Sequence, residues 1–365
     1  MGFRMGIVGL PNVGKSTLFN ALTRTAAAQA ANFPFCTIEP NVGEVAVPDR
    51  RLDTLAGIAG SKQTIPARLT FVDIAGLVRG ASKGEGLGNQ FLANIREVDA
   101  IAHVLRCFED GDVAHVEGRV DPVADAETIE TELMIADMES IERRLQTIAR
   151  KVRGGDKEAV TQERLLKAAS AALEEGRPAR TVEVAEDDEK AWRMLQLLTS
   201  KPVLYVCNVE EGSAGTGNSQ SARVAEMAAA QGAGVVVISA RIEEELAQLD
   251  AEEAEMFLEE MGLEEPGLDR LIRAGYDLLG LQTFFTAGPK ETRAWTIPRG
   301  ARAPQAAGVI HGDFEKAFIR AETIAYDDYV ALGGEAKARE AGKLRAEGKA
   351  YVVQDGDVLN VLHGA

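Results

Sequence analysis

The segment Gly9–Thr17, GLPNVGKST, matches the pattern GxxxxGK(S/T) of a phosphate-binding loop. It follows the apolar run Arg4–Val8 and opens a helix-like pattern, which is the strand–loop–helix context that the motif requires. In such a loop, backbone N–H groups bind a β-phosphate, the Lys15 side chain reaches the β- and γ-phosphates, and the Ser16 hydroxyl is a ligand for Mg²⁺. The residues predicted to bind nucleotide here are Asn12, Val13, Gly14, Lys15, Ser16 and Thr17, with Lys15 also expected to act in catalysis.

A second motif, Asp73–Gly76 (DIAG), ends the apolar run Leu69–Ile74. A carboxylate at the carboxyl end of a buried strand is placed for a water-mediated contact with Mg²⁺, and the backbone N–H of Gly76 can approach a γ-phosphate and act as a switch pivot. Thr37 lies between the two motifs and is expected to complete the Mg²⁺ shell when a triphosphate is bound. We therefore predict metal ligands at Ser16, Thr37 and Asp73, and add Gly76 to the catalytic group.

A third segment, Asn208–Glu211 (NVEE), follows the apolar run Val203–Cys207 at the position where guanine-specific proteins have NKxD. In NKxD the aspartate accepts hydrogen bonds from N1–H and the exocyclic amine of guanine. Here valine replaces the lysine, and glutamate carries its carboxylate about 1.5 Å farther out. Losing buried hydrogen bonds to guanine changes specificity by powers of ten, so we favour ATP over GTP. The residues predicted to surround the base are Asn208, Val209, Glu211, Ser239 and Ala240, with Asn208 expected to meet the adenine amino group.

The elements that position these motifs are short apolar runs that alternate with helical patterns, which predicts a parallel sheet with right-handed crossovers. The predicted strands are Arg4–Val8, Leu69–Ile74, Ile101–Leu105, Val203–Cys207 and Val235–Ser239. Nearly 100 residues separate the third run from the fourth, which is too long for a loop. A separate structure is therefore inserted at this point of an α/β domain.

The insertion has a helical period of its own. Its apolar residues recur at spacings of 4, 3, 4, 3 and 4, which is typical of a coiled-coil seam: Met134, Met138, Ile141, Leu145, Ile148 and Val152. Gly154 and Gly155 end the pattern, and a second helical run follows them. We predict an antiparallel helical hairpin whose first helix has about 25 residues and is about 38 Å long. Two interpretations remain open: a subdomain packed on the body, or a projecting arm for a partner.

The net charge of −17 is confined to one part of the 365-residue chain. Residues 1–120 carry 12 basic and 12 acidic groups, and residues 281–365 carry 11 of each, so the excess lies in residues 121–280. Residues 242–269 contain 12 acidic groups and no lysine or arginine, which predicts surface helices with a solvated acidic face. A chain this acidic is not expected to bind DNA by sequence, although its neutral parts leave room for a local RNA contact.

The amino-acid composition indicates which class of protein this is. Hydrophobic residues make up 45 % and charged residues 27 %, as in globular proteins. Three separated cysteines predict a reducing compartment, and we expect a cytoplasmic, monomeric protein without a signal peptide or membrane span.

We predict three units: residues 1–120 with 197–280 as the nucleotide domain, 121–196 as the helical insertion, and 281–365 as a small α+β domain. In this last unit we expect strands at Thr292–Ile297, Tyr351–Val353 and Val358–Leu362, and a helix near Phe314–Ala321.

Together, the phosphate loop, the DIAG segment with its continuation LVRGASKGEGLGNQFL, the NVEE segment, and tail motifs such as FFTAG, RAWTIP and IHGDFEKAFIRA resemble the YchF/Obg-like ATPase family over essentially the whole chain. The resemblance implies a Ras-like nucleotide domain, a coiled-coil insertion and a C-terminal TGS domain of β-grasp type. It also implies a preference for ATP and an association with ribosomes, for which we expect the large subunit.

The residue that drives hydrolysis is not the usual one. Ras-like proteins often place glutamine directly after DxxG to orient the attacking water, whereas this chain has Leu77. The family's loop histidine maps onto His115, whose neutral imidazole could hold a water. The alternative is that His115 only fixes its loop. As a further hypothesis, Asn12 helps to bind K⁺, which would replace an arginine finger.

Three functions remain open at this stage. The first is a slow Mg²⁺-dependent ATPase whose nucleotide state changes its affinity for the ribosome. The second is a nucleotide-gated binding protein with negligible hydrolysis, which Leu77 favours. The third is a GTP-hydrolysing translation factor, which depends on how the base is recognised.

Overall fold

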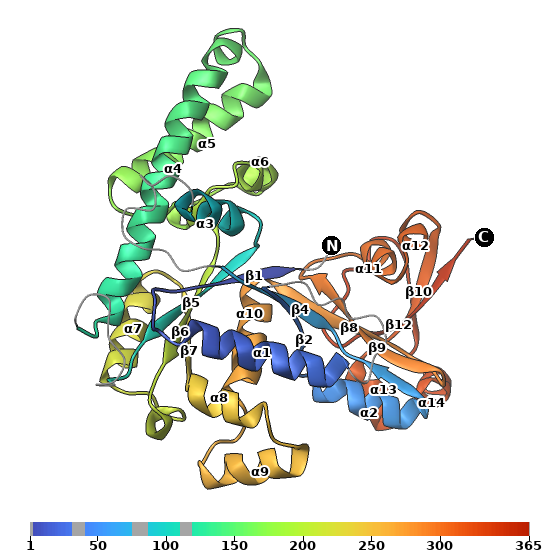
Figure 1. Cartoon of the computed structure of the whole chain (residues 1–365). Coiled ribbons are helices and arrows are strands. Elements are labelled where there is room, and N and C mark those ends of the chain that lie inside the picture. The colour runs from blue at the N-terminus through green and yellow to red at the C-terminus, as the bar shows by residue number, and fades with distance from the viewer. Residues whose placement is uncertain (1–2, 31–40, 75–86, 110–118, 365) are drawn as a thin grey trace. The chain divides into compact units, whose positions relative to one another are not determined.

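The computed structural model describes residues 3–30, 41–74, 87–109 and 119–364 (Figure 1). Contacts between residues divide the chain into two units. The first consists of Met1–Glu44 with Thr70–Gly275, and the second of Val45–Leu69 with Tyr276–Ala365. The part of the chain that is described contains no helix long and apolar enough to cross a membrane.

The sheet that carries the phosphate loop has six strands in the order β2-β4-β1-β5-β6-β7. The strands are β1 (Arg4–Val8), β2 (Val42–Ala46), β4 (Arg68–Asp73), β5 (Ala100–Arg106), β6 (Val203–Asn208) and β7 (Gly234–Ile238). β1 pairs in parallel with β4 and β5, and β6 pairs in parallel with β5 and β7. Every residue of β5 and β6 is buried, as expected for central strands covered on both faces. The five predicted strands are confirmed.

Helices connect these strands. They are α1 (Lys15–Ala30), α3 (Leu87–Arg96), α7 (Ser219–Ala230), α8 (Ala240–Leu246), α9 (Ala251–Glu260) and α10 (Gly267–Leu278). α1 lies beside α8 (Figure 1). The predicted surface helices correspond to α8 and α9, and α9 has no buried residue. Asp250 caps α9 by accepting from the Glu253 N–H, while the Glu253 side chain accepts from the Asp250 N–H.

The helical hairpin predicted between β5 and β6 is present. α4 (Pro122–Arg153) has 32 residues, longer than expected, and α5 (Lys157–Glu174) returns beside it after the turn Gly154–Asp156 (Figure 1). Gly155 has φ +76°, which favours glycine. Ile141, Leu145 and Ile148 of the predicted seam pack against leucines of α5, whereas Met138 is 39 % exposed and does not join them.

A buried polar cluster lies where this hairpin meets the sheet. Arg180, in the short 3₁₀ turn Ala179–Thr181, forms a two-pronged ion pair with Glu130 of α4, at 2.8 and 3.1 Å, and also donates to Gln231. Tyr205 of β6 donates to the same Gln231 oxygen. His103 of β5 lies beside Tyr205, and its Nε2 has no hydrogen-bond partner among the described residues. Burial and the Arg180 charge lower the pKa of His103 to about 3, so this imidazole is neutral.

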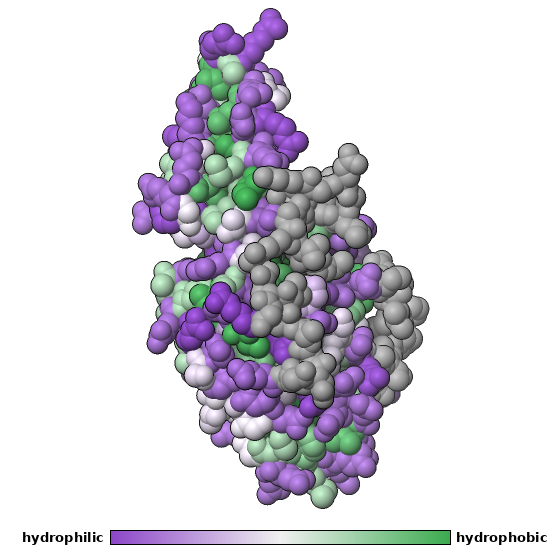
Figure 2. Space-filling model, turned by 60° about the vertical axis from the view of Figure 1, so that its left-hand side comes forward, coloured by the Kyte–Doolittle hydropathy of each residue, from purple (hydrophilic) through white to green (hydrophobic). Residues whose placement is uncertain are grey.

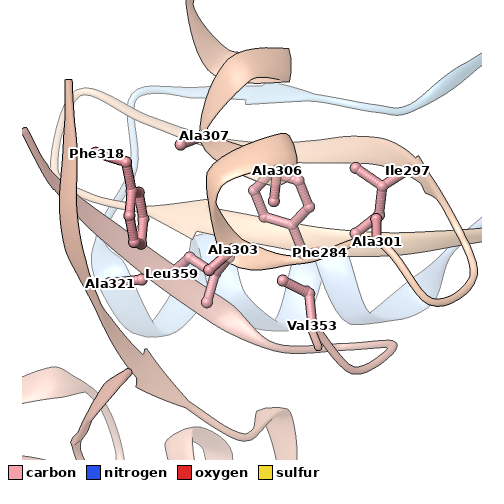
Figure 3. Packing of buried hydrophobic residues seen from close by; sticks show 10 residues of the cluster. All are labelled: Phe284, Ile297, Ala301, Ala303, Ala306, Ala307, Phe318, Ala321, Val353 and Leu359. Carbon is pink, nitrogen blue, oxygen red and sulfur yellow. The ribbon is translucent and has the colours of Figure 1, made fainter. Parts of the chain in front are cut away.

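The second unit contains a mixed sheet in the order β11-β10-β12-β8-β9-β3. Its strands are β3 (Gln63–Ile65), β8 (Leu281–Ala287), β9 (Glu291–Pro298), β10 (Phe318–Ile324), β11 (Arg345–Glu347) and β12 (Val358–His363). Its helices are α2 (Arg50–Ala59), α11 (Ala303–Ile310), α12 (Gly312–Lys316), α13 (Tyr326–Leu332) and α14 (Glu335–Glu340). Phe284, Ile297 and Phe318 pack against the alanines of α11 (Figure 3).

Three features of this unit differ from the sequence prediction. Residues 45–69 pack with the C-terminal residues, because β3 pairs with β9 and the Ser61 hydroxyl bonds Gly288 and Thr292. The helix expected near Phe314–Ala321 ends at Lys316. β10 begins at Phe318, where its pairing with β12 shifts register, and Phe318 and Ala321 both belong to the apolar core of this unit. The expected strand Tyr351–Val353 is reduced to an isolated bridge between Val352 and Arg302.

Candidate nucleotide-binding site

The loop between β1 and α1 has the backbone that its glycines permit. Asn12 and Gly14 both have positive φ, +63° and +93°. A Cβ at Gly14 would lie 2.2 Å from the side-chain nitrogen of Asn208, and a Cβ at Gly9 would lie 2.9 Å from the Val104 carbonyl oxygen. α1 starts directly behind the loop, so free N–H groups at its first turn face the position of a phosphate.

Asn208 joins this loop to the loop after β7. Its side-chain nitrogen donates to the Val13 carbonyl oxygen at 2.9 Å, and its side-chain oxygen accepts from the Ala240 N–H at 2.9 Å. The residue is 5 % exposed. Both ends of the amide are therefore engaged within the protein. This indicates a role in positioning the two loops, and the predicted contact with adenine remains a prediction.

A cavity of about 660 Å³ opens beside the loop. Among its lining residues are eight that the sequence predicts: Asn12, Gly14, Thr17, Asn208, Val209, Glu211, Ser239 and Ala240. Six lining residues were not predicted: Phe108, Glu109, Glu210, Gly212, Arg241 and Glu244. Phe108 and Glu109 lie two and three positions after the end of β5, so the rule that ligands bind at the carboxyl ends of parallel strands could have identified them.

The two neighbouring glutamates of the NVEE segment have different partners. Glu211 forms an ion pair with Arg241 at 3.4 Å, and both side chains are largely exposed at the cavity. Glu210 accepts from Asn218 at 2.9 Å and from the Ser213 hydroxyl. Partial burial alone would raise the pKa of Glu210, but these hydrogen bonds outweigh it and lower that pKa. Of these two glutamates, Glu211 is therefore the one held only by an exposed ion pair.

Lys15 and Asp73, assigned by the sequence to phosphate and to Mg²⁺, form an ion pair with each other. Their side chains are 12 % and 19 % exposed, and the hydroxyl-bearing Ser16 is exposed at the start of α1. One carboxylate and one hydroxyl are a donor set that suits Mg²⁺, which takes its remaining ligands from water and substrate phosphates. The described residues contain no group of three or more His, Cys, Asp or Glu that could hold a metal without such help.

Other predicted residues lie outside the described part of the chain. They are Thr37, Gly76 and His115, together with Leu77. Their roles remain predictions from the sequence.

Glu243 lies on α8, which also carries three residues of the cavity lining, and it was not singled out from the sequence, which predicted a solvated face for residues 242–269. It is 2 % exposed on α8 and accepts from the N–H groups of Gly267 at 2.8 Å and Leu268 at 3.1 Å, at the start of α10. Burial raises the pKa of Glu243 to about 7, against the opposing effect of these hydrogen bonds. Arg270 of α10 donates to the Val237 carbonyl oxygen at 2.9 Å. α10 is thus bound to the elements that carry Ala240 and Arg241.

Two family models match parts of the chain. The model described as 50S ribosome-binding GTPase matches residues 4–152. The model named YchF-GTPase_C, described as a protein of unknown function, matches residues 281–363.

Whole-length relatives extend this similarity. The ribosome-binding ATPase YchF of Bacillus subtilis (strain 168) is 55 % identical over 362 residues, and that of Escherichia coli O157:H7 is 56 % identical over 362 residues; each alignment covers 99 % of both chains. A solved structure of the Schizosaccharomyces pombe YchF GTPase has a TM-score of 0.89 at 39 % identity, covering 99 % of this chain and 98 % of that one. The fold prediction of an α/β nucleotide domain with a C-terminal domain is confirmed, and the chain belongs to the YchF family.

Proposed function

We propose that this protein is a Mg²⁺-dependent ATPase that binds ribosomes and whose nucleotide state changes its affinity for them. The observation that carries the proposal is the cavity that brings the phosphate loop together with Val209 and Glu211. The relatives named ribosome-binding ATPase support both parts of it.

The preference for ATP over GTP rests on two side chains. Val209 is 2 % exposed and has no cationic group to lie along a base. Glu211 is turned to Arg241, so its carboxylate would have to leave an ion pair to accept from guanine. Guanine therefore loses the bidentate contact on which guanine-specific sites depend, whereas adenine, which has no N1–H, loses nothing. The fission yeast relative is named a GTPase, and so the base preference is the first property to measure.

The roles of the phosphate-binding residues follow from their chemistry. Lys15 would leave Asp73 for the β- and γ-phosphates, and Asp73 and Ser16, with Thr37, would hold the metal. Mg²⁺ supplies charge neutralisation for the transferred phosphoryl group. Gly76 would donate its N–H to the γ-phosphate, and His115 would position the attacking water in place of the missing glutamine.

Several finer assignments belong to the same proposal. They are the coiled-coil character of the α4–α5 hairpin, the TGS type of the C-terminal unit, the contact with the large ribosomal subunit, a monomeric state, a cytoplasmic location and K⁺ binding near Asn12. Equal turnover in Na⁺ and K⁺ buffers would contradict the K⁺ assignment.

The test is single-turnover hydrolysis with and without purified ribosomes. We expect slow cleavage of ATP that rises when ribosomes are added. If ribosomes do not change the rate of ATP hydrolysis but nucleotide still controls ribosome binding, the result would favour the nucleotide-gated binding protein that Leu77 suggests.

A further inference from the structure

The charges of the helical insertion are segregated along its length. Residues 121–196 have a net charge of −6, yet residues 143–157 carry six basic groups and one acidic group. The last turns of α4 and the first turn of α5 supply four exposed cations, Arg150, Lys151, Arg153 and Lys157. The hairpin end, defined here as residues 150–157, is therefore a basic surface on an acidic insertion.

Ion pairing separates these four cations from five others of the insertion. Arg164, Lys167, Arg177, Arg180 and Arg193 each form an ion pair with a carboxylate. Among the described residues, no carboxylate lies within ion-pair distance of the four cations of the hairpin end. Their charge is not neutralised within the insertion.

Helix electrostatics account for only part of this cluster. Cations in the last turn of α4 are stabilised by the partial negative charge of the helix C-terminus. Lys157, however, stands in the first turn of α5, where the partial charge is positive and a cation is disfavoured. The placement of Lys157 beside the other three cations therefore needs another reason.

The hairpin end also lies beyond the apolar packing of the arm. Ile148 is the last residue of α4 in the apolar cluster with α5, and Arg153 is five positions farther on. In Figure 1 this end is the part of the hairpin farthest from the sheet, and Figure 2 shows hydrophilic residues over it. With 32 residues, α4 spans about 48 Å, so the end can reach a partner while its base stays on β5 and α7.

We propose that the hairpin end binds the phosphate backbone of ribosomal RNA through Arg150, Lys151, Arg153 and Lys157. An RNA backbone requires cations and little else, whereas a protein interface is organised around buried aromatic or aliphatic anchors. The hairpin end presents four cations that have no carboxylate partner among the described residues, and it has no aromatic side chain. The inference rests on the proposed ribosome binding and names the surface responsible for part of it.

The test compares two variants of the full-length protein that lose the same charge. In the first, Arg150, Lys151, Arg153 and Lys157 are all replaced by glutamine. In the second, the matched control, Arg164, Lys167, Arg177 and Arg193 are replaced by glutamine; these cations are equally exposed but paired. Co-sedimentation with purified ribosomes is measured between 50 and 200 mM salt, together with binding of a plain RNA duplex and basal ATP hydrolysis.

We expect the first variant to bind ribosomes at least about tenfold more weakly, with the slope of log affinity against log salt reduced by about 3. Duplex RNA binding should fall in parallel, while the control variant and basal hydrolysis stay close to wild type. Ribosome binding equal to wild type, or an equal loss in both variants, would overturn the inference and leave the proposed function standing. A loss on ribosomes without any loss on duplex RNA would assign the surface to a ribosomal protein instead. Failure of the wild-type protein to bind ribosomes would remove the proposed function itself.

Discussion

The side-chain amide of Asn208 donates to the carbonyl oxygen of Val13 over 2.9 Å, although 195 positions separate the two residues. The same amide accepts from the Ala240 N–H, so one buried side chain holds both the phosphate loop and the loop after β7. The Asn208 nitrogen also occupies the space that a Cβ at position 14 would need, which explains the glycine there. The phosphate half and the base half of the site thus share one positioning residue.

Replacing Asn208 by alanine should weaken nucleotide binding without removing any residue that contacts phosphate. The change leaves the Val13 oxygen and the Ala240 N–H unpaired, which costs about 1–3 kcal/mol for each group that stays buried. We expect a loss of affinity of at least about tenfold for ATP and ADP alike, measured by calorimetry. Asn360→Ala, which removes an exposed asparagine from the C-terminal unit, serves as the control. Wild-type affinity in N208A would show that the two loops hold each other without this amide.

Replacing Asp73 by asparagine should separate the contribution of the metal to ATP affinity from the contribution of the phosphate contacts. With Mg²⁺ present, we expect ATP affinity to fall by about ten- to a hundredfold, because second-sphere partners of a bound metal typically have that effect. With EDTA, affinity should hold or rise, because Lys15 is freed from its ion pair. The comparison with and without metal is its own control. Equal losses in both buffers would show that Asp73 supports the fold and not the metal.

The buried Glu243 predicts a specific dependence of stability on pH. Its pKa of about 7 in the folded protein lies above the ordinary 4.5, so the folded state binds a proton more tightly than the unfolded chain does. The free energy of unfolding therefore falls as the pH rises from about 5 to about 8, by on the order of 3 kcal/mol from this group. Neighbouring charges modulate the shift: Arg270 lowers this pKa and Asp269 raises it.

Urea unfolding of wild type and E243Q at pH 5.5, 6.5 and 7.5 measures this contribution. The difference in stability between wild type and E243Q should shrink or reverse as the pH rises. Glu245→Gln, on the same helix but exposed, should show no such trend. A difference that stays constant with pH would mean that Glu243 keeps its charge throughout and acts only as a cap for α10.

Restoring the guanine-specific pattern should shift base preference. In the double variant V209K/E211D the carboxylate is shorter and a lysine is available beside the base, as in NKxD. We expect the ratio of GTP to ATP affinity to rise at least about tenfold. E211D alone keeps the buried Val209 and should produce a smaller shift in the same direction. No change in either variant would show that Val209 and Glu211 do not determine the base.

Much of the nucleotide site could be predicted because its residues are local in sequence. Strands that are buried on both faces appear as continuous apolar runs, and the motifs stand directly after them, so β1, β4, β5, β6 and β7 and their loops were found. The contacts made by Asn208 and Glu243 could not be predicted. They depend on which loops and helices the sheet order brings together, and an acidic stretch gives no sign that one of its glutamates is buried.

The division of the chain into two units was harder to predict, because it also depends on which distant elements the fold brings together. β3 has three residues and stands at the edge of its sheet, so it carries no periodic signal. Its pairing with β9, more than 220 positions away, places residues 45–69 with the C-terminal unit. The sequence predicts helix at the start of β10 because Phe318 and Ala321 are also spaced as on a helix face.

Competition between ATP and GTP for the site, with a labelled adenine nucleotide and Mg²⁺ present, tests the proposed activity most directly. We expect unlabelled ATP to displace the label at concentrations at least about tenfold lower than GTP does. We also expect ATP to be the nucleotide hydrolysed when both are supplied. Equal displacement by the two nucleotides, or tighter binding of GTP, would contradict the reading of Val209 and Glu211 on which the proposed activity rests.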